Sequence, residues 1–256
     1  KVAEIAKSID KNIITITFGI FPTLLPEETL NDFEIDYVIL GESEITIRKL
    51  IKAIKNNKNV NKVKGIAFKK SNKIVFTEKR EFIKDLDKEL KFPDRDLIKN
   101  ECYTFPFDKK PFALVLLTRG CPYPCTFCVS PLYYGTKFRT RDPKKVVDEM
   151  ELCYKKYGIE NFMFWGESFT LSKKYGSAIC DEIIGKKLKF KWITTSRVDT
   201  LDLELLKKMK RAGCYLLGLG METPNDNILK NVRKLTTKKN IKNAINLCKQ
   251  ARIKTM

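Results

Sequence analysis

The sequence contains no histidine in 256 residues. This absence excludes general acid–base catalysis by imidazole within the chain, so proton transfer would fall to Asp, Glu, Lys, Tyr or Cys. Acidic residues are outnumbered, with 31 Asp and Glu against 50 Lys and Arg, which gives a net charge of +19. No apolar run approaches the roughly 18 residues of a membrane-spanning helix, so no membrane span is expected.

The positive charge has two interpretations. It suits a nucleic-acid surface, but the lysines are spread over nearly every expected helix and turn rather than gathered in one stretch. Such a spread favours a solvated, lysine-rich surface over a dedicated RNA surface. Eight cysteines without a secretory signal pattern indicate a reducing, cytoplasmic setting. The length allows one large domain or two small ones.

Three cysteines stand at C-x3-C-x2-C spacing in the segment Cys121-Pro-Tyr-Pro-Cys125-Thr-Phe-Cys128, directly after the apolar run 112–117. That run predicts a buried strand, so the three thiols share one loop at a strand end. A disulfide would leave one thiol over, which favours a metal. Zinc needs four ligands, and neither histidine nor a nearby fourth cysteine supplies one. A [4Fe-4S] cluster held by three thiolates keeps one iron open for an outside ligand.

This loop resembles the signature of the radical SAM superfamily. The resemblance implies that the open iron binds the amino and carboxylate groups of S-adenosylmethionine (SAM). An electron from the cluster then cleaves the sulfonium and releases a 5′-deoxyadenosyl radical, which takes a hydrogen from the substrate. It further implies that Phe127 lies near the adenine, that the substrate is a small molecule, and that a donor such as ferredoxin or flavodoxin supplies the electron. No catalytic residue beyond the cluster ligands is assigned.

From Phe112 onward the pattern alternates strands and helices. The expected strands are 112–117, 161–165, 190–194, 214–219 and 253–256, and the expected helices are 143–157, 175–184, 202–212, 228–232 and 239–251. Repeated strand–helix units predict a parallel sheet closing as a TIM-like barrel, with its active site at the carboxyl ends of the strands. The radical SAM core is usually a six-unit partial barrel, so we expect the barrel here to be incomplete at its C-terminal end.

Polar motifs follow three of these strands. The second strand ends at Gly166-Glu167, which resembles the family's glycine–glutamate motif that holds the SAM amino group. The third ends at Ser196-Arg197, where Arg197 could pair with the SAM carboxylate as a planar fork and Ser196 could bond the ribose or carboxylate. The fourth is followed by Glu222, which would approach the SAM ribose. The alternative for each is an exposed polar residue at a turn.

Other residues are assigned with less specificity. Arg139 and Arg141 follow the cysteines and could face an anionic substrate or SAM, although basic loops are common. Phe162, Phe164 and Trp165 are expected in the barrel core. The remaining isolated cysteines of this region are interpreted as small apolar fillers of the core, namely Cys153, Cys180, Cys214 and Cys248.

The first 80 residues predict a second, smaller α/β module. The expected elements are a helix before a strand at 13–20, a turn at 22–26, a helix at 27–32, a strand at 37–40, a helix at 45–54 and a hairpin at 65–77. Residues 81–111, with mixed charge and three prolines, are expected to be a linker to the barrel at 112–256.

This module resembles the later part of the Rossmann-like cobalamin-binding domain that precedes the barrel in one radical SAM class. The matching stretches are Phe18-Gly19 to Pro22-Thr23, Leu25 to Glu28, and Asp36 to Glu44. The family's Gly-Gly-Pro-His is replaced here by Phe18-Gly-Ile-Phe-Pro22. Without histidine, the chain cannot ligate cobalt through imidazole, and since some members bind cobalamin without such a ligand, cobalamin binding stays open. The module is expected to be incomplete at its N-terminus.

Within the class, methyl transfer and radical ring formation or rearrangement are both represented. A second hypothesis is tRNA methylthiolation by a related barrel, which the basic charge favours. That enzyme carries a further three-cysteine cluster in its N-terminal domain, whereas this chain has no cysteine before Cys102. A third hypothesis is a non-enzymatic, metal-stabilised binding module, which would leave the strand-end motifs without a purpose.

Overall fold

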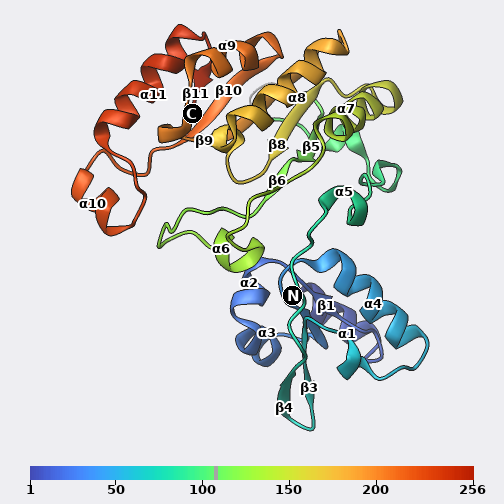
Figure 1. Ribbon diagram of the computed structural model, residues 1–256. Helices are drawn as coiled ribbons and strands as arrows, with labels where there is room; N and C mark the ends of the chain where they lie inside the picture. Colours follow the sequence, from blue (N-terminus) through green and yellow to red (C-terminus); the bar gives the residue numbers. More distant parts are fainter. Residues whose placement is uncertain (107–108) are drawn as a thin grey trace. The chain divides into compact units, whose positions relative to one another are not determined.

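The computed structural model describes residues 1–106 and 109–256. The chain divides into two compact units. The first unit contains Lys1–Lys84 and Val129–Thr136, and the second contains Asp85–Cys128 and Lys137–Met256 (Figure 1). Each unit has a hydrophobic core of its own and is described by itself.

The first unit is built on a four-stranded sheet. Its strands, in spatial order, are β1 Ile16–Thr17, β2 Tyr37–Ile39, β3 Ile66–Lys70 and β4 Lys73–Phe76. The first two are parallel, and β3 and β4 form the expected antiparallel hairpin. Ser71 and Asn72 at its turn both adopt positive φ, 46° and 63°. Such a turn matches the natural twist of two paired strands.

Five helices belong to the first unit: α1 Val2–Ile9, α2 Ile20–Leu24, α3 Pro26–Asp32, α4 Ser43–Lys55 and α6 Ser130–Tyr134. The turn expected at 22–26 was wrong, because Pro22 lies inside the first turn of α2. A proline is tolerated there since the N–H groups of a first turn have no partner within the helix. The strand expected at 13–20 is also shorter, with pairing only at Ile16 and Thr17.

The second unit carries a five-stranded, all-parallel sheet. In spatial order its strands are β11 Lys254–Thr255, β10 Cys214–Gly220, β9 Lys191–Arg197, β8 Asn161–Trp165 and β5 Phe112–Leu116. This order confirms the partial-barrel α/β architecture expected from the alternating pattern. A small antiparallel pair, β6 Thr118–Arg119 and β7 Arg139–Thr140, flanks the cysteine loop in sequence.

Six helices belong to the second unit: α5 Leu86–Glu89, α7 Pro143–Tyr157, α8 Lys173–Gly185, α9 Leu203–Arg211, α10 Asp226–Asn231 and α11 Lys238–Gln250. Helix α7 begins where predicted, because the Asp142 carboxylate accepts the Lys144 N–H at 2.8 Å, and it ends at Gly158 with φ 66°. Helices α7, α8, α9 and α11 line the outer face of the sheet (Figure 1). The carboxyl ends of its strands lead into the connecting loops, which the helices do not cover (Figure 1).

The core of the second unit confirms most of the assigned interior residues. Phe162 and Phe164 are buried, as are the four cysteines interpreted as apolar fillers. The core position of Trp165 was wrong, because its side chain is 47% exposed. Successive side chains of a strand point to opposite faces, so Trp165 cannot share the face of Phe164.

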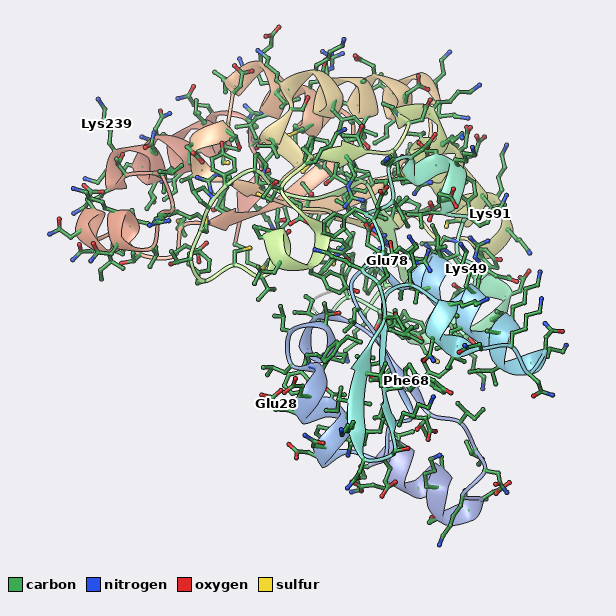
Figure 2. The ribbon with its side chains drawn as sticks, turned by 60° about the horizontal axis from the view of Figure 1, so that its bottom comes forward. Glu28, Lys49, Phe68, Glu78, Lys91 and Lys239 are labelled. Carbon is green, nitrogen blue, oxygen red and sulfur yellow. The ribbon has the colours of Figure 1, made fainter. Side chains whose placement is uncertain are left out.

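Lysines extend from the surface of both units. Figure 2 shows Lys49 on α4, Lys91, and Lys239 on α11, each pointing outward, and all three are exposed. This distribution agrees with a solvated lysine-rich surface. No helix in the described part of the chain is long and apolar enough to cross a membrane.

Candidate SAM and cluster site

The cysteine loop leaves the small antiparallel pair at Gly120, which adopts φ 87°. Within the loop, Cys125 is buried, whereas Cys121 and Cys128 are partly exposed. The backbone N–H of Cys128 donates to the Cys125 carbonyl at 3.1 Å and tightens the second half of the loop. The loop therefore combines a backbone hydrogen bond with two partly exposed thiols.

Burial and several charged groups affect the pKa of the Cys121 thiol. Burial raises the pKa of the Cys121 thiol, and the nearby Glu167 carboxylate and Cys128 thiol raise it further. A backbone hydrogen bond and the Arg197 guanidinium oppose this rise without cancelling it. The Cys128 thiol, the Glu167 carboxylate and the Arg197 guanidinium therefore act electrostatically on Cys121, and Glu167 and Arg197 belong to the strand-end motifs.

The donor set fits an iron–sulfur cluster in its chemistry. All eight cysteines are free. Across residues 1–106 and 109–256, no three His, Cys, Asp or Glu side chains are arranged to hold a single metal ion. A [4Fe-4S] cluster takes each thiolate on a different iron, so its ligands stand further apart than those of one ion. Metal binding deprotonates a thiol, so iron would replace the proton that burial, and after it the anionic neighbours, favours at Cys121.

Gly166 and Glu167 follow β8 and lie against Thr118. The Glu167 N–H donates to Thr118 Oγ1 at 3.2 Å. A Cβ added to Gly166 would come within 2.4 Å of the same hydroxyl oxygen, so only glycine fits this crossing. The tight contact fixes the backbone from which the Glu167 side chain leaves the strand end.

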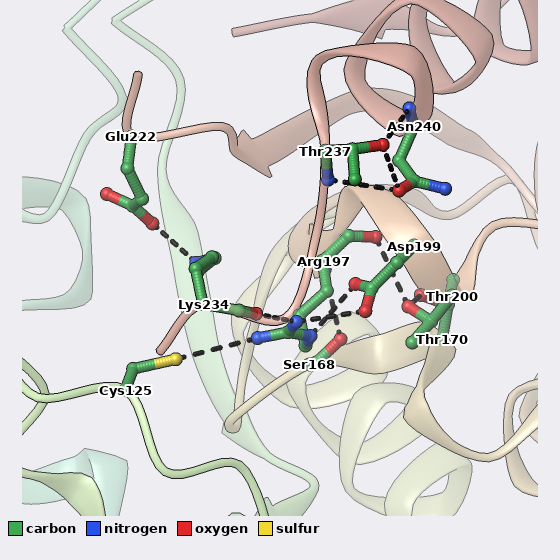
Figure 3. Close-up of polar contacts among 10 residues, drawn as sticks. All are labelled: Cys125, Ser168, Thr170, Arg197, Asp199, Thr200, Glu222, Lys234, Thr237 and Asn240. Atoms are coloured by element: carbon green, nitrogen blue, oxygen red, sulfur yellow. Dashed lines mark hydrogen bonds and ion pairs between the residues drawn. The ribbon is translucent and has the colours of Figure 1, made fainter. Parts of the chain in front are cut away.

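Ser196 and Arg197 are the last two residues of β9, and both are buried. The Arg197 guanidinium donates from Nε and Nη2 to the two oxygens of Asp199, both at 2.9 Å. Its Nη1 faces Cys125 Sγ at 3.6 Å (Figure 3). The guanidinium carbon lies 3.5 Å from the centre of the Tyr123 ring. Although burial lowers the pKa of Arg197, the hydrogen bonds and charge of Asp199 raise it overall.

The Asp199 carboxylate therefore accepts the paired hydrogen bonds of the Arg197 guanidinium that we predicted for the SAM carboxylate. The Arg197 role towards SAM stays a prediction, and the contact that the structure adds is the one to Cys125 Sγ. The hydroxyl of Ser196 is buried without a hydrogen-bond partner in the described residues, so its proposed contact with the ribose also stays a prediction.

Glu222 follows β10 and forms an ion pair that the sequence did not indicate. Its Oε1 accepts from Lys234 Nζ at 2.6 Å (Figure 3). The same ammonium lies 5.5 Å from the centre of the Phe127 ring, whose side chain is 51% exposed. Lys234 was missed because nothing local distinguishes one lysine from the others in a lysine-rich chain.

Arg141 was wrongly expected to face an anionic ligand. It is buried, and its Nη1 donates to Glu149 Oε2 at 2.7 Å and to the Leu116 carbonyl at 3.0 Å. Arg95 reaches the other oxygen of Glu149 at 3.3 Å and the Leu114 carbonyl at 2.8 Å. This buried network holds the edge of β5, the strand that leads to the cysteine loop. Arg139 is likewise buried, in β7.

The first unit contains a separate cavity of about 430 Å³ at the carboxyl end of β2. Thr23, Leu24, Gly41 and Glu42, which belong to the motifs quoted above or adjoin them, contribute to its lining. Ligands of open α/β sheets bind outside the carboxyl ends of the strands. The Glu42 side chain is buried and accepts the Ile83 N–H at 2.6 Å.

Comparison with known proteins identifies the second unit and its relatives. Residues 115–256, more than half of the chain, match the profile of the radical SAM superfamily. An uncharacterized methyltransferase of Pyrococcus horikoshii is 32% identical over 250 residues, covering 97% of this chain and 54% of the relative. The anaerobic magnesium-protoporphyrin IX monomethyl ester cyclase of Synechocystis sp. is 31% identical over 245 residues, covering 94% and 48%. The chain thus spans about half the length of these relatives.

Solved structures share the fold. The radical S-adenosylmethionine methyltransferase TsrM of Kitasatospora setae, with tryptophan and a SAM analogue bound, matches with a TM-score of 0.80 at 19% identity, covering 100% of this chain and 51% of that one. The cobalamin-dependent SAM radical enzyme OxsB, with aqua-cobalamin and SAM bound, matches with a TM-score of 0.83 at 20% identity, covering 99% and 37%. At these identities the likeness concerns the fold.

Proposed function

Because the chain belongs to the radical SAM superfamily, we propose that it binds one [4Fe-4S] cluster through Cys121, Cys125 and Cys128 and cleaves SAM reductively. The observation that carries the proposal is the contact of the Arg197 guanidinium, at the end of a strand of the parallel sheet, with Cys125 Sγ of the three-thiol loop at 3.6 Å. The Glu167 carboxylate, after the neighbouring strand, lies within electrostatic range of Cys121. When bound, the cluster supplies the electron that breaks the sulfonium bond of SAM. A low-potential donor of the ferredoxin or flavodoxin type and a reducing, cytoplasmic setting fit this role.

The chain's own residues would bind and orient SAM. Glu167 presents a carboxylate suited to an ammonium group, from a backbone fixed by Thr118. Glu222 presents a partly exposed carboxylate suited to the ribose hydroxyls. Phe127 offers an exposed ring beside the cysteines, suited to stacking with adenine. The role of each residue stays a proposal.

For the first unit we infer a corrinoid site. The cavity at the carboxyl end of β2 is bordered by the stretches that resemble the cobalamin-binding domain, and its volume of about 430 Å³ suits part of such a cofactor, for example a nucleotide-like tail. No imidazole of this chain can ligate the cobalt. Methyl transfer to a small molecule is the reaction that this combination supports best. Ring formation is the second candidate, because the Synechocystis relative is a cyclase.

The test is anaerobic reconstitution with iron and sulfide, reduction with dithionite and addition of SAM, with and without cobalamin. We expect about four iron atoms per chain and 5′-deoxyadenosine that vanishes in the Cys125→Ala variant. S-adenosylhomocysteine formed only with cobalamin would support methyl transfer. About eight iron atoms would point to a second cluster and the methylthiolation alternative. A colourless protein with one zinc would refute the cluster.

A further inference from the structure

Lys234 is the only buried lysine among residues 1–106 and 109–256. Its side chain is 8% exposed, whereas every other described lysine is partly or fully exposed. An ammonium group is costly to remove from water unless a carboxylate and good geometry compensate. A single buried lysine beside the candidate site therefore calls for a specific interaction, which Glu222 provides at 2.6 Å.

The backbone around this pair is also unusual. Arg233, Leu235 and Glu222 adopt positive φ of 51°, 55° and 59°, a region that residues other than glycine seldom occupy. Leu235 is 63% exposed, whereas Lys234 between these positions is buried. The two residues that flank Lys234, Arg233 and Leu235, thus both adopt left-handed backbone conformations where the lysine turns into the interior. Strain of this kind persists where the surrounding contacts fix it, and it concentrates at functional sites.

The segment that carries Lys234 is bonded to the cysteine loop. The Val232 carbonyl accepts the Thr126 N–H at 3.1 Å, and the Lys234 carbonyl accepts from Arg197 Nη2 (Figure 3). The ammonium itself lies over the Phe127 ring. The lysine is therefore held by its backbone as well as by its charge, so its ammonium can act as a fixed support for Glu222.

The pair lies against the end of β10 at Gly220. A Cβ at that position would come within 3.0 Å of Lys234 Nζ and 3.2 Å of Glu222 Oε1. The ammonium contacts Oε1, while the Glu222 side chain remains 38% exposed. One carboxylate oxygen is thus anchored, and the carboxylate stays accessible to a ligand.

We propose that Lys234 is a positioning residue: by anchoring Glu222 Oε1, it directs the second oxygen of the Glu222 carboxylate towards the hydroxyl groups of bound SAM. The proposal rests on the function proposed above, because it takes SAM as the ligand. It adds the residue that sets the orientation of Glu222. It requires no proton transfer or covalent step.

The experiment measures SAM affinity by equilibrium dialysis on the anaerobically reconstituted chain with its cluster oxidised, alongside iron content. Lys234→Met should weaken SAM binding by about tenfold to a hundredfold, the range of a lost charged hydrogen bond, and leave the iron content unchanged. Lys234→Arg, which keeps the charge, should restore part of the affinity. The exposed neighbour Lys230 provides the matched control, and Lys230→Met should bind SAM as the wild type does.

A double-mutant cycle separates positioning from a merely structural role. Glu222→Gln should weaken SAM binding by a similar factor, and Lys234→Met combined with Glu222→Gln should lose little more than either change alone. Wild-type affinity in Glu222→Gln, or additive losses in the pair, would overturn the proposal even if Lys234→Met folded poorly. Loss of iron in Lys234→Met would also overturn it, since the lysine would then act on the cysteine loop. A wild-type chain that holds its iron but binds no SAM would instead refute the proposed function itself.

Discussion

Replacing Gly166 with alanine should distort the strand end that carries Glu167. The added Cβ would lie 2.4 Å from Thr118 Oγ1, whereas real Cβ contacts essentially never fall below 3.0 Å, so the two atoms must separate by at least 0.6 Å. The Thr118 backbone nitrogen, which a rotation of the side chain cannot move away, would also lie only 3.3 Å from the added Cβ. The same hydroxyl accepts the Glu167 N–H, so relieving the clash also disturbs that hydrogen bond.

The expected loss of stability follows from these contacts. Overpacking of a closely packed site costs about 1–3 kcal/mol, and a lost hydrogen bond costs about 1 kcal/mol more. We therefore expect Gly166→Ala to lower the free energy of unfolding by about 2–4 kcal/mol. SAM binding should weaken as well, because the Glu167 carboxylate would leave the strand end from a displaced backbone.

Urea denaturation of the intact chain measures the first effect. Gly185→Ala is the matched control, because its Cβ would meet nothing within 4 Å and its φ is not left-handed, so its stability should be unchanged or slightly raised. Adding Thr118→Ala to Gly166→Ala should recover part of the loss, since the nearest atom is then removed. A Gly166→Ala chain with wild-type stability, or a double variant that recovers nothing, would refute the steric reasoning.

Three further predictions follow from buried charges and thiols. Glu149→Gln should destabilise the chain by about 3–5 kcal/mol, because Arg95 and the buried Arg141 lose the charge of the buried carboxylate that they share, and Arg141 keeps only the Asp87 carboxylate at 3.3 Å. Lys155→Met, at a pair whose lysine is exposed, should cost under about 1 kcal/mol, and urea denaturation of both variants checks this. Burial raises the pKa of Asp36, but hydrogen bonds from Lys7 and Thr15 lower it overall, so the stability that it contributes is present above its ordinary value of 3.8 and is lost as the pH falls below 3.8 and through the lower pKa of the folded chain. Asp36→Asn should remove this dependence in acid titrations of unfolding. Iodoacetamide with mass spectrometry should modify exposed Cys102 in the folded chain but not Cys180, whose pKa burial raises to about 12, until the chain unfolds.

The sequence by itself determined the architecture and the grouping of three thiols on one loop. The periodicity of apolar residues depends on the local backbone conformation, so it distinguishes strands from helices along the chain. The strands from Phe112 onward and the α7 boundaries at Asp142 and Gly158 were therefore predicted closely. The C-x3-C-x2-C spacing is equally local, since its three thiols share one loop whatever the rest of the chain does.

The tertiary structure alone decided which charges meet. Arg197 and Cys125 are 72 residues apart, and Arg95 and Glu149 are 54 apart, so no local period relates them. Arg141 pairs with Glu149 only eight residues along the chain, but a basic residue after the cysteines looks exposed until the folded chain places this buried carboxylate opposite it. Lys234 was missed for the same reason. Burial of a charge depends on partners that only the folded chain brings together, and local sequence carries no record of that pairing.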